Sequence, residues 1–170
     1  MYYDFGYKTV DLENCIIVNG TRNFGGRERT DRRTGRVMNN EGRRNFLIEL
    51  DPDAYEEFQE KGWNVGRFAP REDGEEPNGF LRVTLSYFKV PPIVHMISEG
   101  NDTLLDEGRV HILDNVNILN LDMRCTAVNK QNRDGEWKKY AFVDEMWVTV
   151  TPDRFATKYA NLNRDHDEDE

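Results

Sequence analysis

Eight arginines lie within residues 22–44 and only three acidic residues offset them, so this segment carries a local charge of +5 (8 − 3). The arginines are Arg22, Arg27, Arg29, Arg32, Arg33, Arg36, Arg43 and Arg44. Phe24 and Phe46 lie beside them in the sequence. A nucleic-acid single strand offers phosphates, which cations bind, and open base faces, on which aromatic rings and guanidinium groups stack. The segment therefore predicts a nucleic-acid contact. The alternative is a solvated loop with both phenylalanines in the core.

Three shorter segments repeat this combination of cations and aromatic rings. They contain Arg67 and Phe68, then Arg82, Phe88 and Lys89, and finally Trp137, Lys138, Lys139 and Tyr140. The last group follows Asp134-Gly135, a dipeptide typical of a tight hairpin turn, so it is placed to close over a bound strand. For each aromatic ring, a position in the core is the alternative.

The C-terminal end has the opposite charge. Residues 165–170 hold five acids and neither lysine nor arginine, so without them the formal net charge changes from −9 to −4 (−9 + 5). The acids are Asp165, Asp167, Glu168, Asp169 and Glu170. Residues 163–170 contain no apolar residue, and we expect them to be a disordered tail. A flexible polyanion competes with nucleic acid for a basic groove and, once released, is available to other proteins. A solubilising end is the alternative.

The sequence offers little support for catalysis, a metal or a cofactor. It has neither a phosphate-binding loop nor a nucleophile elbow. Cys15 and Cys125 form no C-x-x-C pattern and are expected to be reduced core thiols, and the three histidines lie far apart in sequence. Asp144 and Glu145 are adjacent, so on a strand they would point to opposite faces. We therefore expect no enzyme activity, with a nuclease as the alternative, and no membrane span or secretory signal.

Alternation of apolar and polar residues predicts a mainly β fold. The alternating or β-branched runs are 15–18, 46–50, 81–87, 119–127 and 140–150. A period of two buries one face of each strand, as in an antiparallel sheet or barrel. Asp144 interrupts the last run, which predicts a β-bulge or a strand break. The turn at Asp134-Gly135 predicts that residues 119–128 pair with residues 138–150.

One short helix is predicted after Asp51, which can cap it, with Pro52 in the first position. Its apolar face consists of Ala54, Tyr55 and Phe58. Gly62 can end the helix in a left-handed conformation, and Trp63 would then pack back on Phe58. Polar, glycine-containing loops are expected over residues 25–42 and 71–79. This inventory favours an OB-fold-like antiparallel β-barrel with one short helix and long basic loops.

An ordered set of short motifs resembles phage-encoded single-stranded DNA-binding proteins. The motifs are Arg22-Asn23-Phe24, Gly42-Arg43-Arg44-Asn45-Phe46, Leu50-Asp51, Gly62-Trp63-Asn64-Val65, Pro70-Arg71-Glu72 and Leu81-Arg82-Val83. The resemblance runs from about residue 10 to residue 162, and the acidic end is also similar to such proteins. Some of them end in an aromatic residue, whereas this chain ends in Glu170, so competition by its tail would be purely electrostatic.

The resemblance implies an OB-fold domain over residues 1–162, followed by the acidic tail at 163–170. It implies sequence-tolerant binding of single-stranded DNA in phage replication or recombination, in the cytoplasm of an infected bacterial host. Replication or recombination proteins would then bind the tail. The alternatives are a protein–protein adaptor or structural phage protein without nucleic-acid affinity, and an RNA-binding protein that contacts the 2′-hydroxyl.

Replacing two arginines of the 22–44 segment with alanine is expected to weaken binding to oligothymidine. Each lost phosphate contact should also make the log–log salt dependence of affinity shallower by about 0.7. Fluorescence anisotropy across a salt series measures both quantities. An unchanged affinity and an unchanged slope would remove this segment from the interface.

Overall fold

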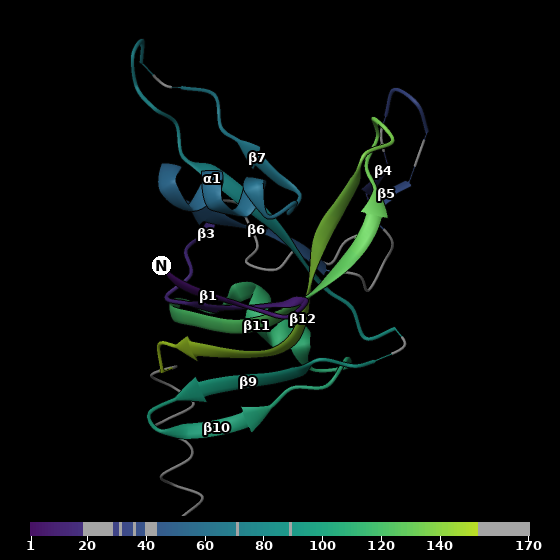
Figure 1. The fold of residues 1–170 in the computed structure, drawn as a ribbon. Coiled ribbons are helices and arrows are strands. Elements are labelled where there is room, and N and C mark those ends of the chain that lie inside the picture. Colours follow the sequence, from purple (N-terminus) through teal and green to yellow (C-terminus); the bar gives the residue numbers. More distant parts are fainter. Residues whose placement is uncertain are drawn as a thin grey trace, which may run out of the picture.

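The computed structural model describes residues 1–18, 29–30, 32–35, 37–39, 44–70, 72–88 and 90–152 (Figure 1). Its strands are β1 (Tyr2–Gly6), β2 (Thr9–Glu13), β3 (Ile17–Val18), β4 (Arg29–Thr30), β5 (Val37–Asn39), β6 (Arg44–Leu50), β7 (Val65–Arg67), β8 (Gly79–Leu85), β9 (Ile93–Ser98), β10 (Asn101–Leu104), β11 (Ile118–Gln131) and β12 (Trp137–Val150). The helices are α1 (Pro52–Glu60) and the 3₁₀ helix η1 (Val110–Asn115). The mainly β fold with one short α-helix is therefore confirmed.

The strands enclose one apolar core, and their alternation decides which side chains enter it. In β6, Phe46, Ile48 and Leu50 are buried while the residues between them are only half-buried. Leu81, Val83 and Leu85 of β8 face the same interior. Burying alternate side chains in this way lets the other face of the sheet meet solvent.

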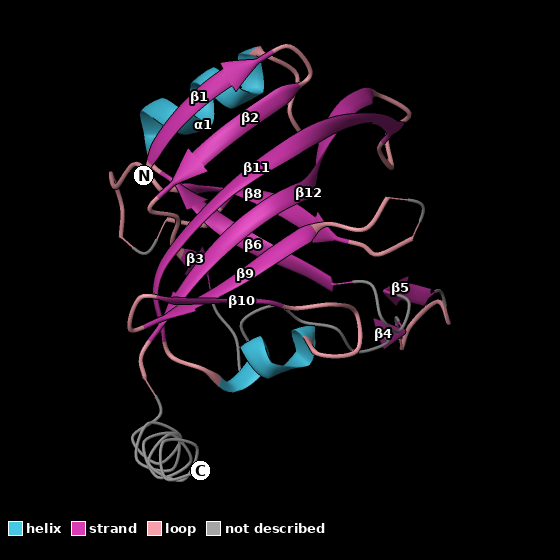
Figure 2. Ribbon diagram, turned by 90° about the horizontal axis from the view of Figure 1, so that it is seen from below, coloured by secondary structure: helices cyan, strands magenta, loops and turns pink. Residues whose placement is uncertain are grey.

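The wall of the barrel follows the order β2–β11–β12–β8–β6–β3 (Figure 2). We count β2 and β3, which are consecutive in the chain, together as the first barrel strand, so that β6, β8, β11 and β12 are the second to fifth. Because β2 and β3 follow each other in the chain, this path returns to its starting point. The sheet is nevertheless not closed by continuous strand pairing, because among the described strands β3 pairs only with β6. The backbone N–H of Cys15 donates to Leu121 O at 2.9 Å, and Ile16 O accepts from the N–H of Glu49 at 2.9 Å. The result is consistent with an OB-like, partly open barrel.

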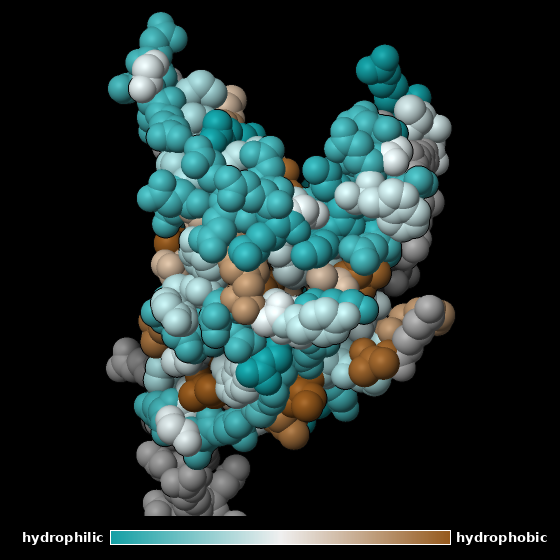
Figure 3. Space-filling view, in the orientation of Figure 1, coloured by the Kyte–Doolittle hydropathy of each residue, from teal (hydrophilic) through white to brown (hydrophobic). Residues whose placement is uncertain are grey.

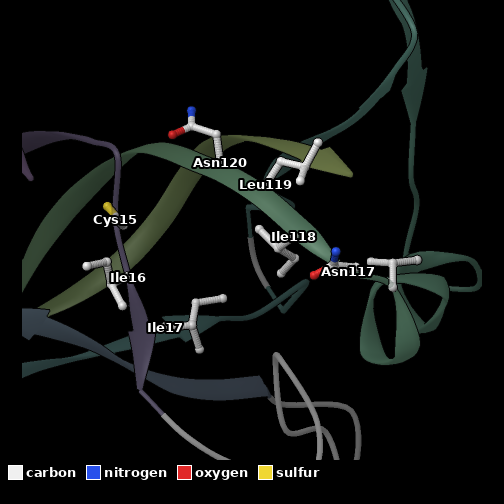
Figure 4. Close-up of a pocket in the computed structure, with 8 residues that line it drawn as sticks. Cys15, Ile16, Ile17, Asn117, Ile118, Leu119 and Asn120 are labelled. Atoms are coloured by element: carbon white, nitrogen blue, oxygen red, sulfur yellow. The ribbon is translucent and has the colours of Figure 1, made fainter. Parts of the chain in front are cut away.

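A groove of about 330 Å³ marks the gap in this wall (Figure 4). Ile16 and Ile17 line one side of it, and Ile118 and Leu119 line the other. The described residues that line the groove include no lysine or arginine. We call this gap the seam.

The sheet is mixed, whereas alternation had favoured an antiparallel one. β12 runs parallel to β8 at Ala141 and Phe142, and parallel to β9 from Glu145 to Thr149. Period-two alternation reports which face of a strand is buried but carries no information on the direction of its neighbour. The alternation pattern therefore could not predict the parallel pairings.

The hairpin of β11 and β12 is the longest feature of the sheet, and each strand has 14 residues. Its turn contains Gly135 with φ of +79°, and the Asn132 side chain accepts the backbone N–H groups of Asp134 and Glu136 at 3.0 Å. The predicted pairing of residues 119–128 with 138–150 is confirmed. The far half of the hairpin extends beyond the barrel as an arm (Figure 1).

Helix α1 packs on the barrel strands through its apolar face, and both of its ends follow the sequence signals. Asp51 Oδ1 accepts the N–H of Ala54 at 2.8 Å, which caps the helix. Gly62 has φ of +86°, and the N–H of Trp63 donates to Phe58 O at 3.0 Å. Phe58 and Trp63 are both buried with ring centroids 5.9 Å apart, which confirms their predicted contact.

Cys15 and Cys125 are free thiols buried in the core, as predicted, and burial raises the pKa of Cys15 to about 12. No α-helix among the described residues has the length and hydrophobicity to cross a bilayer.

A histidine holds β9 and β10 against β12. His95 Nδ1 lies 2.8 Å from Asp102 Oδ2, its Nε2 lies 2.7 Å from Glu145 Oε2, and its ring stacks on Trp147 at 5.3 Å. Burial lowers the pKa of His95, but the hydrogen bonds to Glu145 and Asp102 outweigh it and raise the pKa above 6.5. Only the imidazolium can donate from both nitrogens, so the charged form is the one that links the three strands.

The substitution His95→Gln is expected to lower the free energy of unfolding by about 1–2 kcal/mol below pH ~6.5 and by less at higher pH. A raised pKa in the folded state means that the stabilisation is fully present below the unfolded pKa and is lost as pH rises through the folded value. Urea unfolding at a series of pH values measures this. His111→Gln removes an exposed imidazole from η1 and serves as the control. Parallel pH profiles for wild type and His95→Gln would contradict the linkage.

Candidate nucleic-acid interface

Two connections between strands of the barrel wall are relevant to nucleic-acid binding. Residues 19–43 connect β3 to β6, the first and second barrel strands, and residues 132–136 connect β11 to β12, the fourth and fifth. In OB-folds, the loops at these two positions and the face of the second and third strands bind oligonucleotides. β4 and β5, which belong to the first loop, and the tip of the β11–β12 hairpin both extend on one side of the molecule (Figures 1 and 2).

We define the outer face as the side chains of β6, β8, β11 and β12 that point away from the core. Cross-strand register places Thr84 between Asn45 and Phe142, and the Thr84 hydroxyl donates to Asn45 Oδ1 at 2.8 Å. Arg82 lies opposite Leu47 in the next outward row. Thr84 itself is buried on this face, whereas Asn45 and Phe142 are half-buried and Arg82 is exposed.

A bulge decides which residues of β12 belong to the outer face. Arg124 pairs with Glu145 and Cys125 pairs with Val143, so Asp144 is an extra residue on β12. Before the bulge, Ala141 and Val143 are buried; after it, Met146, Val148 and Val150 are buried. Asp144 itself accepts a hydrogen bond from the Thr126 hydroxyl. The parity switch turns Tyr140 and Phe142 outward.

Aromatic rings lie along the outer face. Tyr140 and Phe142 are half-buried neighbours on β12. Phe80 of β8 packs against Phe68 with ring centroids 4.9 Å apart. Phe88, in the loop after β8, is 80% exposed. Such rings provide flat surfaces on which any base can stack, because every base has a π-face.

Cations accompany these rings. Lys130 and Lys138 lie opposite each other in the hairpin, on the same face as Tyr140 and Phe142. The Lys130 ammonium is 4.8 Å from the centroid of the Phe142 ring and 6.0 Å from that of Tyr140. Arg82 is exposed, and Lys138 lies 3.5 Å from the exposed carboxylate of Glu136. The hairpin arm, and the projection on the other side that carries α1, β7 and the loop before β8, both have mostly hydrophilic surfaces (Figure 3).

Residues 7–169 match a family model described as "Putative phage ssDNA-binding domain". The chain belongs to this family of phage single-stranded DNA-binding domains. A comparison with curated proteins found no match, and neither did a comparison with solved structures. The family description points to a protein that binds single-stranded DNA.

Several predicted residues of this phage DNA-binding domain lie on the outer face or at the hairpin tip. Arg82, Lys138 and Tyr140 lie on the outer face, and Trp137 lies near the hairpin tip. Phe68 packs against Phe80 of that face, and Phe88 is exposed in the loop after β8. Trp137 is 68% exposed at the start of β12, but it points to the opposite face from Lys138. Arg32 and Arg33 are exposed in the connection between β4 and β5, and Arg29 is in β4.

Two other predicted residues lie away from the outer face. The Lys139 ammonium is 5.9 Å from the centroid of the Trp63 ring, and the backbone of Lys139 bonds to Gly62 and Asn64 beside the end of α1. The Arg67 guanidinium is 4.5 Å from the centroid of the Tyr55 ring of α1. The structure therefore does not bring these two cations together with Tyr140 and Phe142.

Arg44 and Phe46 require correction as direct DNA contacts. Phe46 is 5% exposed and belongs to the core, where no base can reach it. The Arg44 guanidinium is buried and forms an ion pair with Asp114 of η1. The chain continues from the arginine segment into β6 with the parity that turns both side chains inward. Arg44 thus anchors the end of the segment instead of meeting phosphates.

The remaining predicted residues lie outside the described part of the chain. They are Arg22, Phe24, Arg27, Arg36, Arg43 and Lys89, together with the tail acids Asp165, Asp167, Glu168, Asp169 and Glu170. The predicted boundary at residue 162 also lies outside it.

Sequence reasoning missed Phe80, Lys130 and Phe142. The interruption at Asp144 was the available signal, because a bulge there reverses the parity of everything before it and turns Phe142 outward. No cluster of three His, Cys, Asp or Glu residues in the described ranges could hold a metal ion.

Phe142→Leu is expected to weaken oligothymidine binding by about 1–3 kcal/mol, because a stacking surface is lost. The salt dependence should not change, since no cation is removed. Anisotropy titrations at several salt concentrations measure both. Phe46→Leu, on the buried face of β6, is the matched control and should lower stability without changing affinity. Equal affinities for wild type and Phe142→Leu would remove Phe142 from the interface.

Proposed function

We propose that this protein binds and protects single-stranded DNA without sequence preference during phage DNA replication or recombination, in the cytoplasm of the infected host. The observation that carries the proposal is the clustering of Tyr140 and Phe142 with Lys130, Lys138 and Arg82 on the outer face. This face lies between the two loops that bind oligonucleotides in OB-folds.

Binding would combine two kinds of contact. Bases would stack on the outer-face rings, at roughly 1–3 kcal/mol per base. Phosphates would pair with the hairpin lysines, Arg82 and the arginines of residues 22–44. Neither contact depends on the hydrogen-bonding edges of the bases, which accounts for sequence tolerance.

The acidic tail at residues 165–170 would act as an intramolecular competitor. Its five acids carry the charge of a short single strand and are covalently held at high local concentration. DNA would displace the tail from the basic surface and make it available to replication or recombination proteins. This competition is electrostatic and would fade as salt screens the charges.

An RNA-binding protein and a protein–protein adaptor make different predictions. RNA preference requires contacts to the 2′-hydroxyl, so an oligouridine would bind more tightly than an oligothymidine of equal length. An adaptor without nucleic-acid affinity would bind neither. The family match favours single-stranded DNA over both.

Removing the tail is expected to tighten binding at low salt. The comparison uses residues 1–170 and residues 1–163 with labelled oligothymidine, and the difference should disappear above about 0.5 M salt, where the Debye length is only a few ångströms. A full-length chain with the five tail acids changed to their amides (Asp→Asn and Glu→Gln) separates charge from length and should behave like the shorter chain. Absence of binding by every form at low salt would favour the adaptor. Equal affinities for all forms would reject competition by the tail.

A further inference from the structure

The ammonium group of a lysine already lies over two aromatic rings of the outer face, Tyr140 and Phe142. The Lys130 ammonium is 4.8 Å from the centroid of the Phe142 ring and 6.0 Å from that of the Tyr140 ring. Both distances are within the range at which an ammonium is attracted to the negative face of an aromatic ring. One cation thus covers the two rings best placed to receive bases.

The hairpin register explains how one lysine reaches both rings. Tyr140 pairs with Val128 and Phe142 pairs with Thr126, whereas Lys130 pairs with Lys138 two residues nearer the tip. The Lys130 side chain therefore extends back along the hairpin, over the rings. Lys138 is on the same face but lies beside Glu136, at 3.5 Å. The two lysines are thus matched in position, and Lys130 is the one whose ammonium lies over the rings.

A base and an ammonium cannot occupy the same ring face at the same time. Stacking of one base favours binding by about five-fold or more. A partly exposed cation–π contact favours its own geometry by only about two- to five-fold. Displacement of the ammonium by a base is therefore favourable. The released cation is then beside the backbone of the arriving strand, and the flexible lysine stem allows it to turn toward a phosphate.

We propose that Lys130 is an exchangeable cover for the stacking platform of Tyr140 and Phe142, which leaves the rings and pairs with a phosphate when single-stranded DNA binds. This inference rests on the proposed function, since it assumes that the outer face receives DNA. It assigns Lys130 two opposing effects: its contact with the rings competes with bases, while its charge attracts the strand.

Lys130→Gln separates the two effects because they depend differently on salt. The variant should lose one phosphate contact, so its log–log salt slope should be shallower by about 0.7. Its Tyr140 and Phe142 rings should also be uncovered, and the resulting gain in base stacking should not depend on salt. We expect binding about two- to three-fold weaker than wild type near 0.05 M salt and about two-fold tighter near 0.5 M salt, with the two curves crossing between these concentrations.

Two matched variants test the cause of the crossing. Lys138→Gln should flatten the slope by a similar amount but stay weaker than wild type at every salt concentration, because Lys138 covers no ring. In a Phe142→Leu background, Lys130→Gln should lose most of its gain at high salt, since the closer ring is gone. Thermal melting of each variant verifies folding, and Lys130→Met provides a second uncharged side chain if Lys130→Gln unfolds.

The outcomes distinguish this inference from the proposed function. A crossing with Lys130→Gln that disappears in the Phe142→Leu background supports the exchangeable cover. If wild type binds DNA but Lys130→Gln is weaker at all salt concentrations, as Lys138→Gln is expected to be, the cover is rejected while the proposed function stands. If wild type does not bind DNA at low salt, the proposed function fails, and this inference fails with it.

Discussion

The extra residue Asp144 in β12 is the constraint on which the rest of the arrangement depends. β12 pairs with β11 along its length, with β8 at Ala141 and Phe142, and with β9 after the bulge. Without the bulge, the same set of alternate side chains would face the core along the whole strand. The bulge lets the second half of β12 bury Met146 and Val148 while the first half turns Tyr140 and Phe142 toward solvent. One inserted residue thus allows the same strand to build the core and the candidate interface.

Local signals predicted local structure well. Three local features could be predicted because each depends on a few consecutive residues: the Asp51 cap, the left-handed Gly62 and the Asp134-Gly135 turn. The interface was harder to predict. Phe46 and Phe142 are both phenylalanines in alternating strands, yet one is in the core and the other is outside, because parity depends on registers set by distant strands. The ion pair between Arg44 and Asp114 joins residues 70 positions apart, and nothing near Arg44 in the sequence marks it as buried.

A net charge of −9 does not prevent a cationic surface, because charges act over short distances in salt solution. Several acids of the described residues are engaged within the fold. Asp11 receives the Arg124 guanidinium at 2.7 Å, and Asp102 and Glu145 flank the imidazole of His95. On the outer face, Lys130 lies over the Phe142 ring and Lys138 lies beside the exposed Glu136. The local field that a strand meets is therefore set by where the charges lie rather than by their sum.

The seam has a mechanical consequence for the arginine segment. The two ends of this segment are attached to the barrel by strand pairings of unequal length. At its beginning, β3 pairs with β6 at only two residues, although β2 before it pairs with β11 at four. At its end, β6 pairs with β8 over seven residues, and Arg44 is tied to Asp114. Tension on a strand bound to residues 19–43 would therefore peel β3 from the wall first, while β6 bears the load and the core stays closed.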